Sequence, residues 1–197
     1  MKKSKKKDLK KQLLKKPQYQ IANTRMRRFF ALIIDWYLTT MLASIPITFY
    51  LRGDSYLKAK MFDFTNYNSI TAYSLIAFGL MIGLIYYIII PTYLWKGQTI
   101  GKKICQIKIV KENGNDITFS TLLLRELVGS TFLEGGIVIM ATYLRKILPF
   151  IGLSSFVSPL QYLAYALTII SIIYAYFNPL SQSFHDKLAK TIVIKKN

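Results

Sequence analysis

The sequence predicts an all-α membrane protein, a four-helix transmembrane bundle with a small cytoplasmic β-hairpin or interfacial segment. Of its 197 residues 52% are hydrophobic, yet the formal net charge is +18. These two properties coexist because they are segregated along the chain: lysines crowd residues 1–28 and the short connections, and the apolar runs carry almost no charge. This segregation is typical of a polytopic membrane protein.

Four apolar runs are long enough, or nearly long enough, to cross the roughly 30 Å hydrocarbon core as helices. The predicted spans cover about residues 29–51, 70–95, 127–144 and 159–178. The only charge in the first is Asp35, and the second has none. The third is the shortest and contains Glu134, so it either spans fully or only enters the interface. Prolines interrupt the last run before its helix begins, at about Pro159.

The distribution of lysine and arginine predicts the orientation. With both termini in the cytoplasm, 22 of the 27 Lys and Arg residues lie inside and five lie outside. Only an even number of spans gives this result, so the positive-inside tendency favours four spans in a cell membrane.

Residues 1–22 form a basic tail that we expect to be cytoplasmic and in contact with anionic lipids, while residues 23–197 form the transmembrane domain. A basic chain can also indicate nucleic-acid binding, but such a module has no use for bilayer-length apolar runs, so no nucleic-acid partner is expected. The one cysteine, Cys105, excludes an internal disulfide.

The cytoplasmic segment after the second span shows strand-like alternation. Ile107 and Ile109, then Ile117 and Phe119, alternate with polar residues on either side of a Gly-Asn turn, which predicts a hairpin or a pair of interfacial segments. Residues 191–194 also favour a strand and could add an edge to this sheet.

Arg28 and Asp35 lie seven positions apart on the first helix. Seven residues turn about 700° and rise about 10 Å, so the two side chains share a face, with Asp35 deeper in the bilayer. An ionised carboxylate at that depth costs about 2.5–3.5 kcal/mol unless it is paired or hydrated. Arg125 or another cytoplasmic base is the expected partner. Two interpretations stay open: Asp35 is a buried polar staple between helices, or it moves a cation or a proton.

Glu134 is a second intramembrane acid, which faces the bundle if the third span is genuine. His185, beside Asp186 after the last helix, is either a local capping residue or a proton acceptor, since histidine titrates near physiological pH. The glycine-containing turn after the second span places Lys96, Lys102 and Lys103 at lipid phosphates rather than around a nucleotide, because the spacing does not fit a phosphate-binding loop.

Four sequence blocks follow one another along the chain: Arg28-x-x-Ala31-x-x-x-Asp35, Gly97-Gln98-Thr99-Ile100-Gly101-Lys102, Arg125, and His185-Asp186-Lys187-x-Ala189-x-Thr191. In residues and in order they resemble the RDD family of membrane proteins. The resemblance covers about residues 23–197. The arginine and two aspartates that name the family correspond to Arg28, Asp35 and Asp186. The resemblance implies transport of an unidentified ligand, and some relatives resemble cation–proton antiporters. The long lysine tail and Glu134 depart from the pattern.

We therefore expect a transporter, a monovalent cation/proton antiporter that uses Asp35, with Arg28, Arg125, Glu134, His185 and Asp186 around it and a homodimer as its assembly. The alternative is a non-transporting scaffold or accessory subunit that binds anionic lipid or a protein partner. No Ser/His/Asp set or metal-binding spacing occurs, so no enzyme activity, cofactor or metal is expected.

Overall fold

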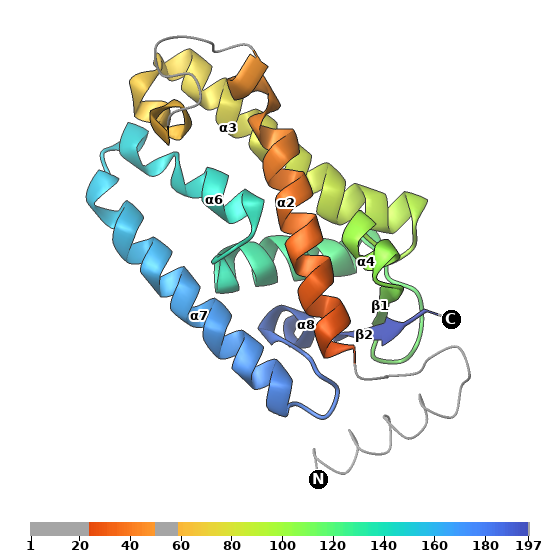
Figure 1. The fold of residues 1–197 in the computed structure, drawn as a ribbon. Helices are drawn as coiled ribbons and strands as arrows, with labels where there is room; N and C mark the ends of the chain where they lie inside the picture. The colour runs from red at the N-terminus through yellow and green to blue at the C-terminus, as the bar shows by residue number, and fades with distance from the viewer. Residues whose placement is uncertain (1–23, 50–58, 197) are drawn as a thin grey trace.

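The structure is a computed structural model and describes residues 24–49 and 59–196. The basic tail predicted over residues 1–22 therefore lies outside the described residues, as do Arg52 and Lys58 of the predicted outer loop. The described part is mostly helical, and a small two-stranded sheet lies at the end where α2 begins (Figure 1).

Three helical segments are long and apolar enough to cross a membrane, with 24 to 26 residues each. They are, in chain order, α2 (Arg25–Phe49), α3 (Ser69–Leu84) with its π-helical continuation η3 (Ile85–Leu94), and α7 (Val157–Phe177) with the preceding turn η6 (Ser154–Phe156). They overlap the runs predicted as spans over residues 29–51, 70–95 and 159–178, and their ends differ from the predicted ones by five residues or fewer.

The segment predicted as the third span, 127–144, is not one straight helix. One segment runs through α5 (Phe119–Leu122) and the π-helical η4 (Leu123–Glu134), and a second begins with α6 (Ile139–Arg145); the two are bent by 54°. The helix ends because Gly135 adopts a left-handed conformation with φ +64°, and its N–H donates to the carbonyl of Ser130. The described residues thus contain three spans, or four if the bent pair crosses as one.

The sheet joins two segments that are far apart in the sequence. β1 (Ile107–Lys111) pairs antiparallel with β2 (Thr191–Lys195), so that Ile109 lies opposite Val193. Both strand segments were predicted, but the hairpin with Ile117 and Phe119 was wrong, because Phe119 opens α5. Pairing of β1 with the C-terminal strand is favoured because it buries apolar surface: Ile192, Val193 and Ile194 are all buried.

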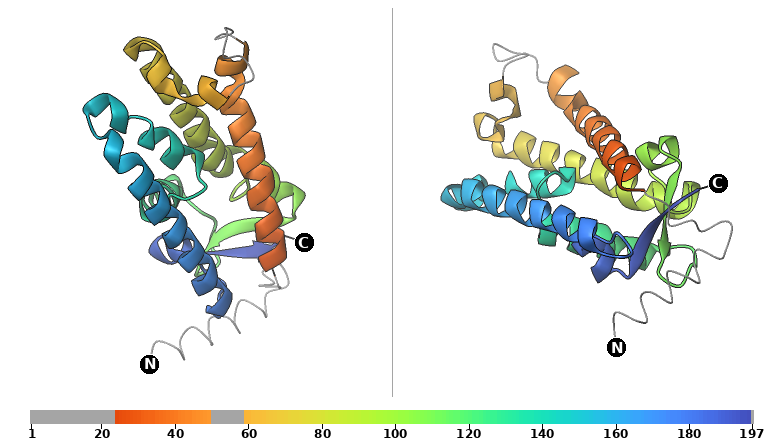
Figure 2. Two further views of the ribbon diagram at one scale, coloured as in Figure 1. Left: turned by 60° about the vertical axis from the view of Figure 1, so that its left-hand side comes forward. Right: turned by 60° about the horizontal axis from the view of Figure 1, so that its bottom comes forward.

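Short helices connect these elements. They are η1 (Ala59–Phe62), η2 (Phe64–Asn66), α4 (Ile100–Ile104), η5 (Leu148–Ile151) and α8 (Phe184–Leu188). Side-chain caps fix the starts of α4 and α8: the hydroxyl of Thr99 accepts from the N–H of Lys102, and Ser183 and Asp186 form a reciprocal capping box. Figure 2 shows α8 and the sheet at the same end of the molecule as the start of α2.

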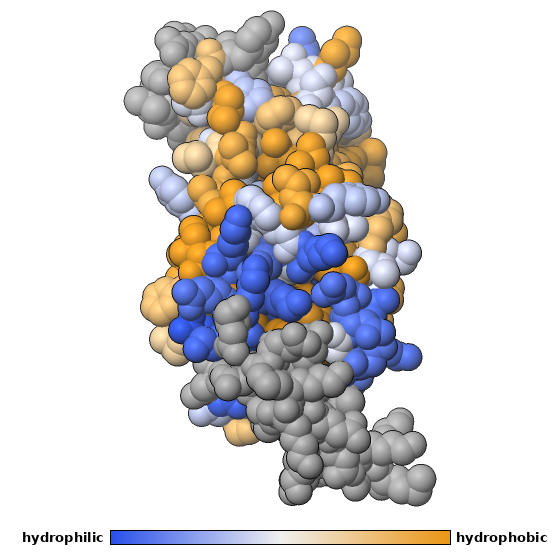
Figure 3. All heavy atoms as spheres, turned by 90° about the vertical axis from the view of Figure 1, so that its right-hand side faces the viewer, coloured by the Kyte–Doolittle hydropathy of each residue, from blue (hydrophilic) through white to orange (hydrophobic). Residues whose placement is uncertain are grey.

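The bundle packs through small residues, as membrane helices do. Gly79 and Gly83 of α3 lie against Tyr143 and Met140 of α6 so closely that a Cβ atom at either glycine would collide with them. The buried stripe of α7 consists of Ala164, Thr168 and Ser171, while its other faces carry exposed isoleucines and tyrosines. This inverted pattern fits a helix that faces lipid. Figure 3 shows hydrophilic side chains gathered toward one end, next to an apolar surface.

Candidate functional site

Asp35 of α2 is buried, with 1% of its surface exposed, and every group around its carboxylate is a donor. Tyr86 donates to Oδ1 at 2.6 Å and the backbone N–H of Gly101 donates to the same oxygen at 2.8 Å. Thr99 donates to Oδ2 at 2.6 Å, and the Lys102 ammonium lies 3.4 Å from it. The carboxylate therefore joins α2 to η3 and to the turn and helix that follow it.

The close approach of α4 to α2 requires glycine at position 101. A Cβ atom there would lie 2.5 Å from the carbonyl oxygen of Ala31 and 2.6 Å from Oδ1 of Asp35. The glycines that the sequence places in a turn thus have two uses: Gly97 supplies φ +88° where the helix ends, and Gly101 admits the carboxylate.

Lys102 was expected at lipid headgroups, and the structure corrects this expectation. Its side chain points to Asp35 and is 14% exposed, so it is the basic partner of Asp35 that the sequence left unidentified. Lys96 and Lys103 are exposed, and the ammonium of Lys103 lies over the Trp95 ring, 4.3 Å from its centroid. For these two lysines the headgroup contact stays a prediction.

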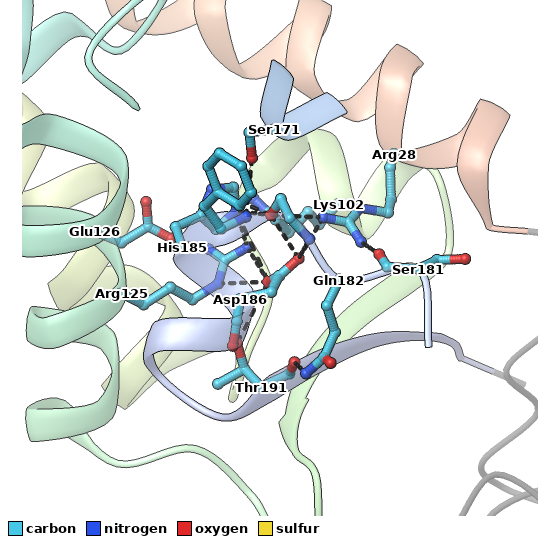
Figure 4. Close-up of polar contacts among 12 residues, drawn as sticks. Arg28, Lys102, Arg125, Glu126, Ser171, Ser181, Gln182, His185, Asp186 and Thr191 are labelled. Atoms are coloured by element: carbon cyan, nitrogen blue, oxygen red, sulfur yellow. Dashed lines mark hydrogen bonds and ion pairs between the residues drawn. The ribbon is translucent and has the colours of Figure 1, made fainter. Parts of the chain in front are cut away.

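Arg28 does not pair with Asp35, although both lie on the same face of α2. It pairs with Asp186 of α8, where its Nη2 lies 2.5 Å from Oδ2. Arg125 of η4 reaches the other oxygen of Asp186 with Nε at 3.0 Å and Nη2 at 2.9 Å, as Figure 4 shows. Such forked contacts between guanidinium and carboxylate are among the stronger charge-assisted hydrogen bonds.

Asp186 has no exposed surface. Burial by itself opposes ionisation, but Arg28 and Arg125, with a further hydrogen bond from the Ser183 hydroxyl at 2.8 Å, hold the pKa of its carboxyl well below the ordinary value. Asp186 is therefore a permanent anion at physiological pH. It connects three elements, namely the start of α2, the first turn of η4 and α8.

A second acid lies on the other side of His185. Oε1 of Glu134 lies 2.9 Å from Nδ1 of His185 and accepts from the Ser171 hydroxyl of α7 at 2.6 Å. Nε2 of His185 lies 2.9 Å from Nη2 of Arg125. A continuous polar network thus runs from Arg28 to Glu134, and Glu126 joins it through an ion pair with Arg125.

These two groups of residues lie on the walls of one cavity of about 260 Å³. Asp35, Arg28 and Lys102 line it together with Arg125, Glu134 and His185. Of the six residues predicted for the transport site, five line this cavity, and Asp186 contacts two of them, Arg28 and Arg125. Both π-helical segments, η3 and η4, contribute to the walls, and π-helical turns often occur at functional sites.

Sequence reasoning missed Tyr86, Thr99, Glu126, Ser171 and Ser183. Thr99 could have been found, because it lies inside the Gly-Gln-Thr-Ile-Gly-Lys block. For Tyr86 and Ser171 there is no local signal, because a hydroxyl in an apolar helix gives no indication of which carboxylate it will contact. Glu126 and Ser183 adjoin selected residues, but their partners come from the tertiary structure. Among residues 24–49 and 59–196, no three His, Cys, Asp or Glu side chains are grouped so that they could hold a metal ion.

Comparison with known proteins places this arrangement in a family. No solved structure matches the chain with significance. An uncharacterized protein of Bacillus subtilis (strain 168), YckC, is 42% identical over 48 residues, which are 24% of this chain and 31% of that protein. The chain therefore matches less than a third of that relative's length. The sequence model of the RDD family matches residues 23–190, which include Arg28, Asp35 and Asp186. Since this match covers most of the chain, the protein is a member of the RDD family and a polytopic membrane protein.

Proposed function

We propose that this RDD-family membrane protein is a transporter that exchanges a monovalent cation for protons. The observation that supports it is the cavity within the bundle, whose lining includes five of the six ionisable residues selected from the sequence. Charged side chains inside membrane segments are costly, and they mark ion and proton pathways more often than other sites.

Asp35 is the exchange group in this proposal. Its Oδ2 faces the Lys102 ammonium at 3.4 Å, which is longer than a tight ion pair and leaves the two charges separable. A monovalent cation or a proton that reaches the carboxylate competes with Lys102 for the same oxygen. Tyr86 and Gly101 hold Oδ1 throughout, so the carboxylate keeps its position while its partner changes.

Glu134 and His185 are the proton-handling pair. Their 2.9 Å contact allows a proton to pass between the imidazole and the carboxylate, and both line the cavity. Asp186 has a different task, because two arginines hold it as an anion. It positions Arg28 and Arg125 and fixes the electrostatic potential of the wall.

The orientation follows from the same proposal. If the bent pair of helices crosses the cell membrane as one span, both termini and the β1–β2 sheet lie in the cytoplasm, in agreement with the lysine distribution. Four helices are few for a transporter that opens its site alternately to the two sides of the membrane, so we expect the protein to work as a homodimer.

Everted membrane vesicles that contain the protein test the proposal. With a proton gradient formed across the vesicle membrane, sodium, lithium and potassium salts are added in turn and the gradient is followed with a pH-sensitive dye. We expect one of the three cations to dissipate the gradient. Asp35→Asn is expected to abolish the response, while Asp63→Asn, which makes the same change on the exposed connection before α3, retains it.

Asp35→Asn also weakens the packing of α2 against α4, so Glu134→Gln is a second variant, and gel filtration in detergent shows whether each variant is folded. If wild-type protein leaves the gradient unchanged with all three cations, exchange of these ions is refuted. Such a result favours the scaffold alternative, in which exposed lysines such as Lys96 and Lys103 bind anionic lipid. If folded Asp35→Asn exchanges at the wild-type rate, Asp35 is not the site.

A further inference from the structure

The cavity is not closed on the side between α2 and α7. Its lining there comes from α2 and from α7. The large apolar side chains among these lining residues are Phe29, Leu32, Trp36, Ile172 and Tyr176, and each of them is at least 37% exposed. They recur at helical spacing and form one apolar stripe on each helix. Side chains that both line a cavity and remain exposed border an opening, and this one lies on the apolar flank of the bundle. Its environment is therefore the bilayer.

A cation lies at the end of this opening nearest the β1–β2 sheet. Arg25 lines the cavity, donates one hydrogen bond to the carbonyl of Tyr176 at 2.7 Å and lies over the Tyr176 ring at 4.3 Å. Within the described residues Arg25 has no acidic partner, whereas Arg28, Lys102 and Arg125 each contact a carboxylate. A guanidinium has five N–H donors, so Arg25 keeps four for another acceptor.

We propose that this opening binds one anionic phospholipid from the leaflet next to the sheet. The phosphate accepts hydrogen bonds from Arg25, and an acyl chain lies along the apolar stripes of α2 and α7. The order of groups on the wall matches such a molecule: the unpaired cation is at the interface, and the apolar side chains follow one to three turns deeper along α2.

The size of the cavity agrees with this occupant. About 260 Å³ is slightly below the roughly 300–1,000 Å³ of pockets that enclose a small ligand, so the cavity takes part of the lipid while the rest stays in the bilayer. A zwitterionic lipid brings its own ammonium group together with the phosphate, so it adds no net negative charge beside Arg25. A second copy of this chain brings another arginine at this position. Charge complementarity therefore selects an acidic headgroup. Lipid binding at Arg25 does not depend on cation exchange, in which Arg25 has no part.

Native mass spectrometry of the full-length protein tests this site. The protein is released from nanodiscs that contain equal amounts of phosphatidylglycerol and phosphatidylcholine, and the lipid retained on each monomer is counted and identified. We expect one phosphatidylglycerol per chain. Arg25→Gln is expected to weaken its binding about tenfold or more, the effect of one lost charge-assisted hydrogen bond. The control is Arg27→Gln, which removes the same charge two residues on, where the side chain instead reaches the carbonyl of Cys105.

A second pair of variants tests the apolar part. Ile172→Trp fills the opening from α7 and is expected to exclude the lipid, while Ile173→Trp, at a neighbouring residue with the same exposure that does not line the cavity, is expected to retain it. Equal losses in Arg25→Gln and Arg27→Gln, or equal retention of both lipids, overturn the proposal. So does displacement by millimolar inorganic phosphate, which indicates a site for a free anion, and so does a lipid-free dimer that Ile172→Trp disrupts.

Discussion

Replacing Asp186 by asparagine removes one negative charge at nearly constant volume from a position without solvent exposure. In the native protein its carboxylate receives Arg28 at 2.5 Å and the fork of Arg125 at 2.9 and 3.0 Å. In the variant Arg125, itself 3% exposed, keeps only Glu126 as a close acid. The NH₂ group of the asparagine is a hydrogen-bond donor, and it would face the N–H donors of Arg28 or Arg125.

We expect Asp186→Asn to lower the free energy of unfolding by about 3 kcal/mol. Breaking a buried ion pair from one side costs roughly 3–5 kcal/mol, because the remaining charge stays buried without compensation. We take the lower end since Glu126 still contacts Arg125 and Arg28 is partly exposed. For a chain of this length, a change of about 3 kcal/mol corresponds to a fall in melting temperature of about 6–12 °C.

Thermal unfolding of the purified protein in detergent, followed by tryptophan fluorescence, measures this difference. The control is Asp116→Asn, because Asp116 is 52% exposed and pairs with Lys108 at 3.4 Å. Surface pairs contribute about 0–1 kcal/mol, so this variant should melt close to the wild type. If both variants melt at the same temperature, the buried junction does not stabilise the fold as argued.

The dependence on pH follows from the lowered pKa of Asp186. A carboxyl whose pKa is lower in the folded protein contributes stability above the unfolded pKa, near 3.9, and loses it as the pH falls through the folded pKa. The difference in the free energy of unfolding between the wild type and Asp186→Asn should therefore be constant from pH 5 to 8 and become smaller only in strong acid. A difference that shrinks between pH 7 and 5 would assign the effect to another group.

Two further predictions concern the connection between α3 and β1. Gly101→Ala should destabilise the protein by about 1–3 kcal/mol, because the added Cβ overpacks against Ala31 and Asp35; an unchanged melting temperature would refute the close approach of α4 to α2. Cys105, the only cysteine, should react with a membrane-impermeant maleimide in everted vesicles but not in intact cells, and labelling only in intact cells would reverse the proposed orientation. Burial and the nearby Asp35 raise the pKa of its thiol, so the reaction should be slow at pH 7 and accelerate toward pH 9.

The sequence by itself determined the membrane class and three of the helices. Hydropathy is a local property, so a bilayer-length run without charge identifies a span wherever its neighbours lie. Strand segments 107–111 and 191–195 were also visible from their composition. The sequence did not predict the bend in the third run, because the average hydropathy over residues 127–144 does not show the left-handed turn at Gly135 that ends the helix.

Only the tertiary structure decided which charges meet. Helix periodicity correctly put Arg28 and Asp35 on one face, but it contains no information about what other elements bring to that face. Arg28 pairs with Asp186, which is 158 positions away in the sequence, and Asp35 pairs with Lys102, which is 67 positions away. A charge buried in an apolar bundle needs a partner, and packing brings that partner from a distant part of the chain. The sequence can therefore predict that a partner exists, while the packing of the helices selects it.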